Sequence, residues 1–204
     1  MDETTQRKWD QAAKNFDLMA GYGPEKRWAP KKNEFFSVME GRILFLAVGT
    51  GLDIPFFPRD RDIVGIDISP KMIEKARDRA DSYQGKLELR VLDVHDLEYD
   101  DDTFDQVFTS CTFCSVPNPV HGLESLRRVL KPGGELHMFE HTGSRYFPFN
   151  VMMNLMTPLS SRLGPDMNRP TVDNVRRAGF DILEVRHVYL DVVKTIHARV
   201  PATP

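Results

Sequence analysis

A glycine-rich turn between two apolar segments is the part of the sequence best suited to chemistry. Residues 42–48 read Arg-Ile-Leu-Phe-Leu-Ala-Val, and the glycines Gly49 and Gly51 follow. Such an apolar run is typical of a buried parallel strand, and glycines after it let a ligand approach the backbone closely. A second apolar run, residues 62–67, ends on Asp67, whose carboxylate could accept hydrogen bonds from ribose hydroxyls. Together the two features predict a site for a nucleoside-bearing cofactor.

Strands and helices are expected to alternate around this turn, which favours a parallel sheet covered on both faces. Ser69-Pro70 and Asn118-Pro119 each supply a helix N-cap and a first-turn proline. We predict an α/β fold, a Rossmann-like doubly wound and mostly parallel sheet with an antiparallel edge hairpin. The expected strands are residues 42–48, 62–67, 86–92, 104–108, 135–140, 181–187 and 190–199, and the expected helices are residues 3–20, 25–39, 69–80, 118–129 and 172–178.

The composition limits the classes of protein to which the chain could belong. Its 204 residues are 41% hydrophobic, as in an ordinary soluble domain, and its net charge of -3 disfavours a general nucleic-acid binder. The longest apolar runs are far shorter than the roughly 20 residues of a membrane span. Residues 1–6 lack the basic and apolar regions of a signal peptide. We expect a cytoplasmic monomer with no nucleic-acid partner.

The two cysteines form a single Cys-x-x-Cys pair, Cys111 and Cys114. Such a pair could be redox-active or half of a zinc site, but no second pair of cysteines completes a metal cage. We expect reduced thiols and no metal ligands.

Two segments are expected to elaborate the main domain, residues 41–204. Residues 1–40 are predicted to form a helical lid, whose first helix carries Trp9 and Phe16 on one face. That helix could pack over the core, close a cofactor site or touch the inner membrane surface. Residues 145–165 form an apolar insert with three methionines, which either fills the edge of the core or walls an apolar acceptor pocket that could face lipid.

Five motifs in order resemble the class I S-adenosylmethionine-dependent methyltransferases. They are Gly49-x-Gly51, residues 65–69 (Gly-Ile-Asp-Ile-Ser), Asp93 at a strand end, residues 104–108 (Phe-Asp-Gln-Val-Phe) and residues 128–134 (Arg-Val-Leu-Lys-Pro-Gly-Gly). The resemblance runs from about residue 16 to residue 198 and implies S-adenosylmethionine as cofactor and S-adenosylhomocysteine as product.

The resemblance also implies a role for each matched residue. The turn from Ala47 to Gly51 would bind the methionine end of the cofactor, Asp67 the ribose and Asp93 the adenine amino group. The full set of cofactor-binding residues is Phe16, Ala47, Gly49, Gly51, Asp67, Ile68, Met72, Asp93, Val94, Thr109 and Ser110, with the last two near the sulfonium.

The first motif departs from the family. Phe45 and Ala47 stand where the family has an acid and a glycine. The acid helps to orient the methionine amino group, so an inactive cofactor-binding relative stays open as an alternative. An NAD-dependent dehydrogenase is a further alternative, although the chain lacks a full Gly-x-Gly-x-x-Gly.

The second half resembles lipid-active methyltransferases, including bacterial phospholipid N-methyltransferases and membrane-associated thiol methyltransferases. The similarity lies in Ser115-Val-Pro-Asn-Pro119 and in Glu140-His141. It implies N-methylation of phosphatidylethanolamine toward phosphatidylcholine, with a small thiol or quinone as the alternative acceptor. His141 would be the base, since histidine titrates near neutral pH. The other residues assigned to the acceptor are Glu140 and Tyr22 as catalytic groups, and Arg145, Tyr146 and Arg169 as substrate contacts.

Overall fold

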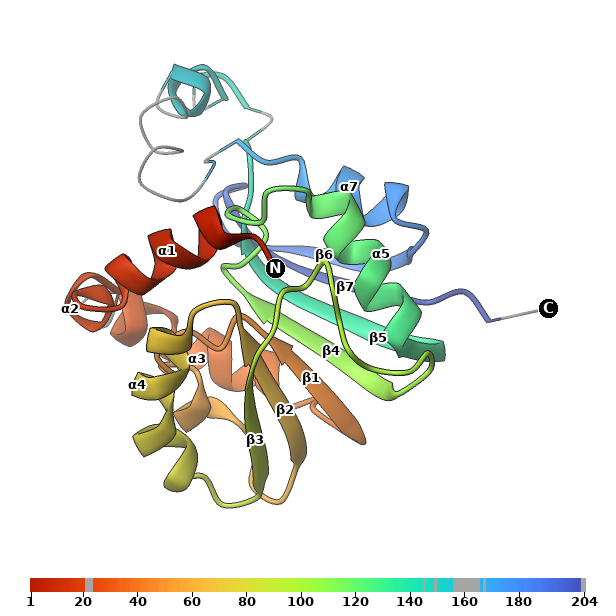
Figure 1. Ribbon diagram of the computed structural model, residues 1–204. Coiled ribbons are helices and arrows are strands. Elements are labelled where there is room, and N and C mark those ends of the chain that lie inside the picture. The colour runs from red at the N-terminus through yellow and green to blue at the C-terminus, as the bar shows by residue number, and fades with distance from the viewer. Residues whose placement is uncertain (21–23, 145, 149, 156–165, 167, 203–204) are drawn as a thin grey trace.

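The computed structural model describes residues 1–20, 24–144, 146–148, 150–155, 166 and 168–202 (Figure 1). Its centre is a 7-stranded sheet in the order β3-β2-β1-β4-β5-β7-β6. Strands β1 to β5 pair in parallel, and β7 pairs antiparallel with β5 and with β6. The predicted mostly parallel sheet with an antiparallel edge is therefore confirmed. The strands are β1 Arg42–Leu46, β2 Asp62–Asp67, β3 Lys86–Val91, β4 Phe104–Ser110, β5 Leu130–His141, β6 Asp181–Tyr189 and β7 Val193–Arg199.

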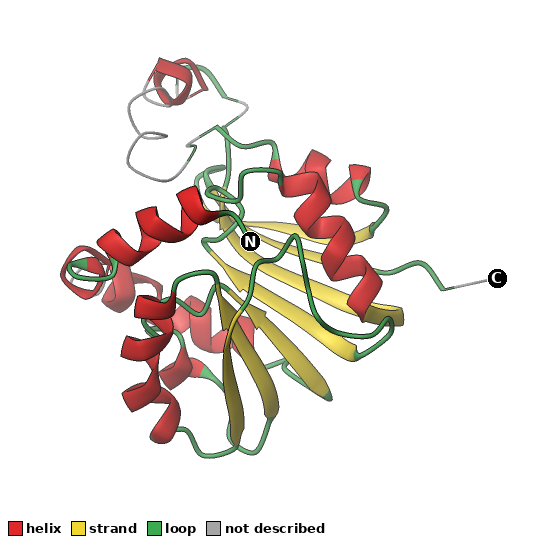
Figure 2. Cartoon of the chain, viewed as in Figure 1, coloured by secondary structure: helices red, strands yellow, loops and turns green. Residues whose placement is uncertain are grey.

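Helices cover both faces of this sheet (Figure 2). One face packs against α5, through Leu123 and Leu126, and against α7, through Val175. The other face packs against α3, through Phe36, and against α4, through Ile73. Because both faces are buried, the central strands are almost continuously apolar. The helices are α1 Glu3–Ala12, α2 Phe16–Ala20, α3 Pro24–Phe36, α4 Pro70–Asp81, α5 Pro119–Val129 and α7 Thr171–Arg177, with a short 3-10 helix at Ile54–Phe56.

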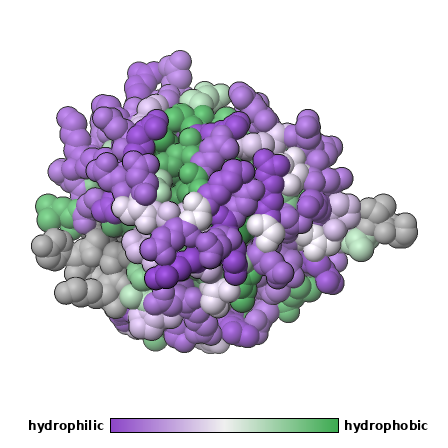
Figure 3. Space-filling view, turned by 90° about the horizontal axis from the view of Figure 1, so that it is seen from below, coloured by the Kyte–Doolittle hydropathy of each residue, from purple (hydrophilic) through white to green (hydrophobic). Residues whose placement is uncertain are grey.

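The outer surface contrasts with these buried faces. Seen from below, hydrophilic residues cover most of the molecule, and hydrophobic residues are confined to smaller patches (Figure 3). No helix in the described ranges is both long and apolar enough to span a bilayer.

The N-terminal region differs from the single helix expected over residues 3–20. The chain forms α1 and α2 with a break between them, and Asp2 caps α1 by accepting the Thr4 N–H at 2.9 Å. The next helix, α3, continues through Pro30. Pro30 is exposed, and the buried Phe36 at the end of α3 belongs to the core of the main domain. A boundary at residue 40 therefore does not separate two hydrophobic cores.

Candidate active site

A pocket opens at the carboxyl ends of the central parallel strands, where ligands bind in open α/β sheets. Figure 1 shows α1 lying across this end of the sheet, between α4 and the segment that follows β5. The pocket brings together Phe16, Ala47, Gly49, Asp67, Ile68, Met72, Asp93, Val94 and Ser110 from the sequence-predicted cofactor set. Its lining also includes Asp2, Thr5, Trp9, His95, Cys111 and Thr112, which sequence reasoning did not assign to a site.

Asp67, at the tip of β2, ties the glycine turn to the start of α4. Its Oδ2 accepts the Gly49 N–H at 2.9 Å and its Oδ1 accepts the Ser69 N–H at 2.9 Å. Burial raises the pKa of this carboxyl to about 6. A carboxylate held in this way on the pocket wall can accept hydrogen bonds from ribose hydroxyls.

The two glycines of the turn serve different purposes. Gly49 lines the pocket with φ +57, and a methyl group there would stand 3.8 Å from the Phe16 ring. Gly51 has φ +84, and a Cβ would lie 2.8 Å from Ile54 Cδ1 and 3.3 Å from the Ala76 backbone. Gly51 is not part of the pocket lining, so its contribution is the close approach of α4 to the turn.

The two unusual residues of the first motif also differ in their surroundings. Phe45 is 1% exposed and its ring packs against those of Phe36 and Phe57, with centroids 5.8 and 4.9 Å away. Ala47 lines the pocket and adopts φ 56, the left-handed region that favours glycine. The turn thus keeps the glycine-type backbone with an alanine in it.

Replacing Ala47 by glycine is expected to increase the free energy of unfolding by about 0.5–1 kcal/mol. Relief of left-handed strain contributes about 1–2 kcal/mol, and the extra freedom of glycine in the unfolded chain removes about 0.5–1 kcal/mol. Thermal unfolding should then show a Tm about 1–4 °C higher. Ala80→Gly, the same change in the ordinary helical backbone of α4, should lower Tm. A lower Tm for Ala47→Gly would mean that contacts of the Ala47 methyl group outweigh the strain.

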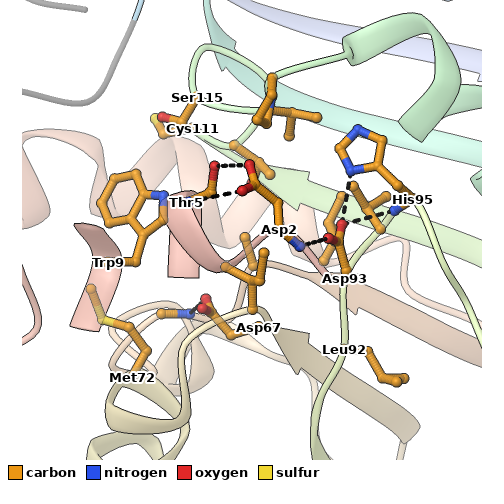
Figure 4. Close-up of a pocket in the computed structure, with 18 of the residues that line it drawn as sticks. Asp2, Thr5, Trp9, Asp67, Met72, Leu92, Asp93, His95, Cys111 and Ser115 are labelled. Carbon is orange, nitrogen blue, oxygen red and sulfur yellow. Dashed lines mark hydrogen bonds and ion pairs between the residues drawn. The ribbon is translucent and has the colours of Figure 1, made fainter. Parts of the chain in front are cut away.

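At the adenine end predicted by sequence, Asp93 already has protein partners (Figure 4). Its Oδ2 accepts the Asp2 N–H at 2.9 Å, and its Oδ1 lies 2.8 Å from Nδ1 of His95. Burial alone would raise the pKa of Asp93, but the hydrogen bonds from His95 and Asp2 outweigh it and lower that pKa. The start of α1 is therefore docked on the carboxylate that the resemblance assigns to adenine.

Two more acids fasten α1 and α2 over the pocket. Asp10 accepts the Ser69 hydroxyl at 2.6 Å, which joins α1 to the N-cap of α4. Asp17 pairs with Arg79 at 3.0 Å and accepts the Thr50 hydroxyl, which joins α2 to α4 and to the glycine turn. These contacts hold Trp9 and Phe16 in the pocket wall.

Glu140 supports the loop after β4 rather than facing the pocket. It is fully buried, and its carboxylate accepts the Thr109 hydroxyl at 2.7 Å and the backbone N–H groups of Thr112 and Phe113 at 3.0 and 3.1 Å. Burial raises the pKa of Glu140 to about 7. Neither Glu140 nor Thr109 lines the pocket, and the carboxylate of Glu140 is engaged by the loop, whereas Cys111 and Thr112 of the supported loop are in the lining.

Of the remaining acceptor residues, those that the structure describes, His141, Tyr146 and Arg169, lie outside the pocket lining. Nδ1 of His141 is buried and has no hydrogen-bond partner among the residues described. Burial, and then the charge of Lys194, lowers the pKa of His141, so the ring is neutral near pH 7 and can take up a proton. Arg169 pairs with Asp166 at 2.6 Å. Tyr146 is 64% exposed, and Tyr22 and Arg145 lie outside the described residues.

The thiols are poorly suited to nucleophilic attack at neutral pH. Cys111 opens onto the pocket and Cys114 is buried. Burial raises the pKa of both, that of Cys114 to about 12, so both are protonated.

Comparison with known proteins first identifies the class of fold. An S-adenosylmethionine-dependent methyltransferase from Methanosarcina mazei superposes with a TM-score of 0.66 at 20% identity, over 82% of this chain and 96% of that one. The chain thus has the Rossmann-like methyltransferase fold.

Sequence comparison then identifies the family. Residues 44–138 match the methyltransferase domain family. A ubiquinone/menaquinone biosynthesis C-methyltransferase of Geotalea daltonii is 32% identical over 72% of this chain and 67% of its own length. A phosphatidylethanolamine N-methyltransferase of Cereibacter sphaeroides is 29% identical over 68% of this chain and 76% of its own length. A human thiol S-methyltransferase is 28% identical over 82% of this chain and 75% of its own length. The chain belongs to the S-adenosylmethionine-dependent methyltransferases and is an enzyme that uses this cofactor and releases S-adenosylhomocysteine. The dehydrogenase alternative is set aside.

Proposed function

We propose that the enzyme N-methylates phosphatidylethanolamine at a membrane surface. The observation that carries this proposal is a group of exposed apolar side chains in the segment after β5. Phe147 is 81% exposed and Leu155 is 76% exposed, and Tyr146, Val151 and Met152 are exposed beside them in sequence. Contiguous exposed apolar surface on a protein is typical of an interaction site for a membrane or an apolar ligand.

Backbone contacts join this segment to the pocket. The Asp166 N–H donates to the Cys114 carbonyl at 2.8 Å, and the Gly143 N–H donates to the Arg169 carbonyl at 3.0 Å. Both ends of the segment are thereby fixed near the loop after β4, whose Cys111 and Ser115 line the pocket. Since Trp9 of α1 and Phe16 of α2 are turned toward the pocket, we assign the membrane contact to residues 146–155.

The residues can be given roles in such a reaction. The cofactor, when bound, supplies an electrophilic methyl group on a sulfonium, and the protein supplies orientation and exclusion of water. The amine of the head group must be neutral to attack, and Nδ1 of His141, which no described residue hydrogen-bonds, would take its proton directly or through water. Arg169 would approach the phosphate, since guanidinium matches its geometry.

The relatives support an apolar acceptor without selecting one. Their names specify a phospholipid, a quinone precursor and a thiol as substrates of those proteins. A small thiol or a quinone is therefore the second candidate acceptor. The quinone acceptor is favoured by the sequence identity of the ubiquinone/menaquinone biosynthesis relative and by the share of this chain that it matches.

The test supplies the enzyme with methyl-labelled cofactor and vesicles that contain phosphatidylethanolamine. We expect labelled mono- or dimethylated lipid. For His141→Ala, the rate of lipid methylation should fall at least about 100-fold with cofactor affinity unchanged.

Phe147→Asp and Leu155→Asp should each raise the vesicle concentration needed for half-maximal rate by about 10-fold, because a charge replaces an inserted apolar group. Leu183→Asp is the matched control, since Leu183 is exposed on β6, away from this segment. Label in a thiol or a quinone precursor but not in lipid would contradict the phospholipid assignment and favour the second candidate.

A further inference from the structure

A second cluster of chemically capable side chains lies on the sheet face covered by α3. Glu135 and His137 are alternate residues of β5, so their side chains project from the same face. His197 lies directly opposite His137 in the antiparallel pairing of β5 with β7. Oε2 of Glu135 is 3.0 Å from Nε2 of His137 and 3.3 Å from Nε2 of His197. We propose that Glu135, His137 and His197 bind a divalent transition-metal ion of the zinc type.

The spacing of the donor atoms supports this assignment. One ligand atom from each of the three residues can be chosen so that all lie within 4.8 Å of one another. Donors about 2.0–2.1 Å from a tetrahedral zinc ion stand roughly 3.3 Å apart, close to both oxygen–nitrogen distances in the cluster. Two imidazoles and one carboxylate form a donor set that zinc and related divalent ions accept, with a further position left open.

The cluster is also held in place by its neighbours. The His137 ring stacks between Phe108, at 4.6 Å, and His197, at 4.4 Å. Nε2 of Gln106 approaches Glu135 Oε2 at 3.5 Å. Nε2 of His197 is buried and makes no hydrogen bond within the described part of the chain, although it is near the carboxylate. A metal ion between these atoms would give that nitrogen a partner.

A metal ion can reach the cluster from solvent through a groove that is separate from the cofactor pocket. His137 is 7% exposed, whereas Glu135 and His197 are about one-third exposed on a groove that Glu34 and Glu184 also line. The groove shares no lining residue with the cofactor pocket. His137 precedes His141 by four residues, about 13 Å along a strand. A metal ion here would join β5 to β7 and stabilise the antiparallel part of the sheet rather than take part in methyl transfer.

The experiment is a zinc titration of the untagged, chelator-treated protein. The parent for this titration carries Cys111→Ser and Cys114→Ser, so that thiols cannot bind the ion. We expect saturable binding of one zinc per chain, followed by calorimetry, and a visible tetrahedral spectrum with Co²⁺. At zinc concentrations about 100 times the Kd, Tm should rise by roughly 5–10 °C. His197→Ala in this background should weaken zinc binding by at least about 100-fold and abolish the Tm shift.

His187→Ala is the matched control, because His187 lines the same groove without belonging to the cluster. It should bind zinc as the parent does. Equal zinc affinity in the parent and His197→Ala would overturn the proposal, and so would the lack of saturable binding in a folded parent. In either case the cluster would be a hydrogen-bonded acid–histidine group only.

Discussion

Asp67→Ala is expected to weaken binding of S-adenosylmethionine by at least about 100-fold. A carboxylate that accepts two ribose hydroxyls makes two charge-assisted hydrogen bonds, each contributing about 1.5–3 kcal/mol. The same carboxylate holds the Gly49 and Ser69 N–H groups, so its removal also loosens the turn. Calorimetric titration with S-adenosylhomocysteine measures the loss, and thermal unfolding of each variant separates weak binding from failure to fold. Asp62→Ala, at the exposed start of the same strand, should leave the affinity unchanged.

The affinity for S-adenosylmethionine should also depend on pH, because burial raises the pKa of Asp67. Burial raises the pKa of Asp67 to about 6, and only the ionised form accepts hydrogen bonds at both oxygens. Affinity for the cofactor should therefore be constant above about pH 7 and fall as pH drops through 6. His95 also lines the pocket and contacts Asp93, so the titration is repeated with His95→Gln. A pH dependence that disappears in His95→Gln would contradict the assignment to Asp67.

The cofactor-binding part of the site, the glycine turn and Asp67, is the part that the sequence predicts best. The glycine turn follows one strand directly in sequence, and Asp67 is the last residue of the next strand. Because the two strands are parallel, their carboxyl ends lie at the same edge of the sheet. The mostly parallel sheet followed from the alternation of segments for the same reason. Gly51 was assigned to the ligand, yet it serves the packing of α4, because a glycine motif does not reveal which side of the turn is crowded.

Contacts between distant segments could not be predicted in this way. Asp2 meets Asp93 across 91 residues, and nothing local marks an N-cap aspartate as part of a pocket wall. His197 meets His137 only through the register of β7 on β5, so the proposed metal cluster has no spacing signature, and the sequence analysis had expected no metal ligands. Glu140 was assigned to the acceptor because it precedes His141. Successive residues of a strand point to opposite faces, however, and the carboxylate of Glu140 is turned inward.

That inward position makes Glu140→Ala the most destabilising change we expect. The substitution leaves the N–H groups of Thr112 and Phe113 and the Thr109 hydroxyl without their acceptor inside the protein. Each unpaired buried donor costs about 1–3 kcal/mol, so the free energy of unfolding should fall by about 4 kcal/mol. Urea unfolding measures this loss. A change below about 1 kcal/mol would show that water or a shifted loop replaces the carboxylate.

Glu140→Gln should separate the charge of this side chain from its hydrogen bonds. The pKa of Glu140 is raised from 4.5 to about 7 by burial, so the folded state binds the proton more tightly than the unfolded state. The stabilisation from this group is fully present below pH 4.5 and is lost as pH rises through 7, with a total of about 3 kcal/mol. An amide can keep its oxygen toward the two N–H groups and donate to the Thr109 hydroxyl, and it carries no charge at any pH. Glu140→Gln should therefore be more stable than the parent at pH 9 and lose this advantage toward pH 5. Because every other ionisable group is the same in both proteins, the difference between the two unfolding free energies isolates Glu140. A difference that does not change between pH 5 and pH 9 would mean that the N–H groups keep Glu140 ionised throughout.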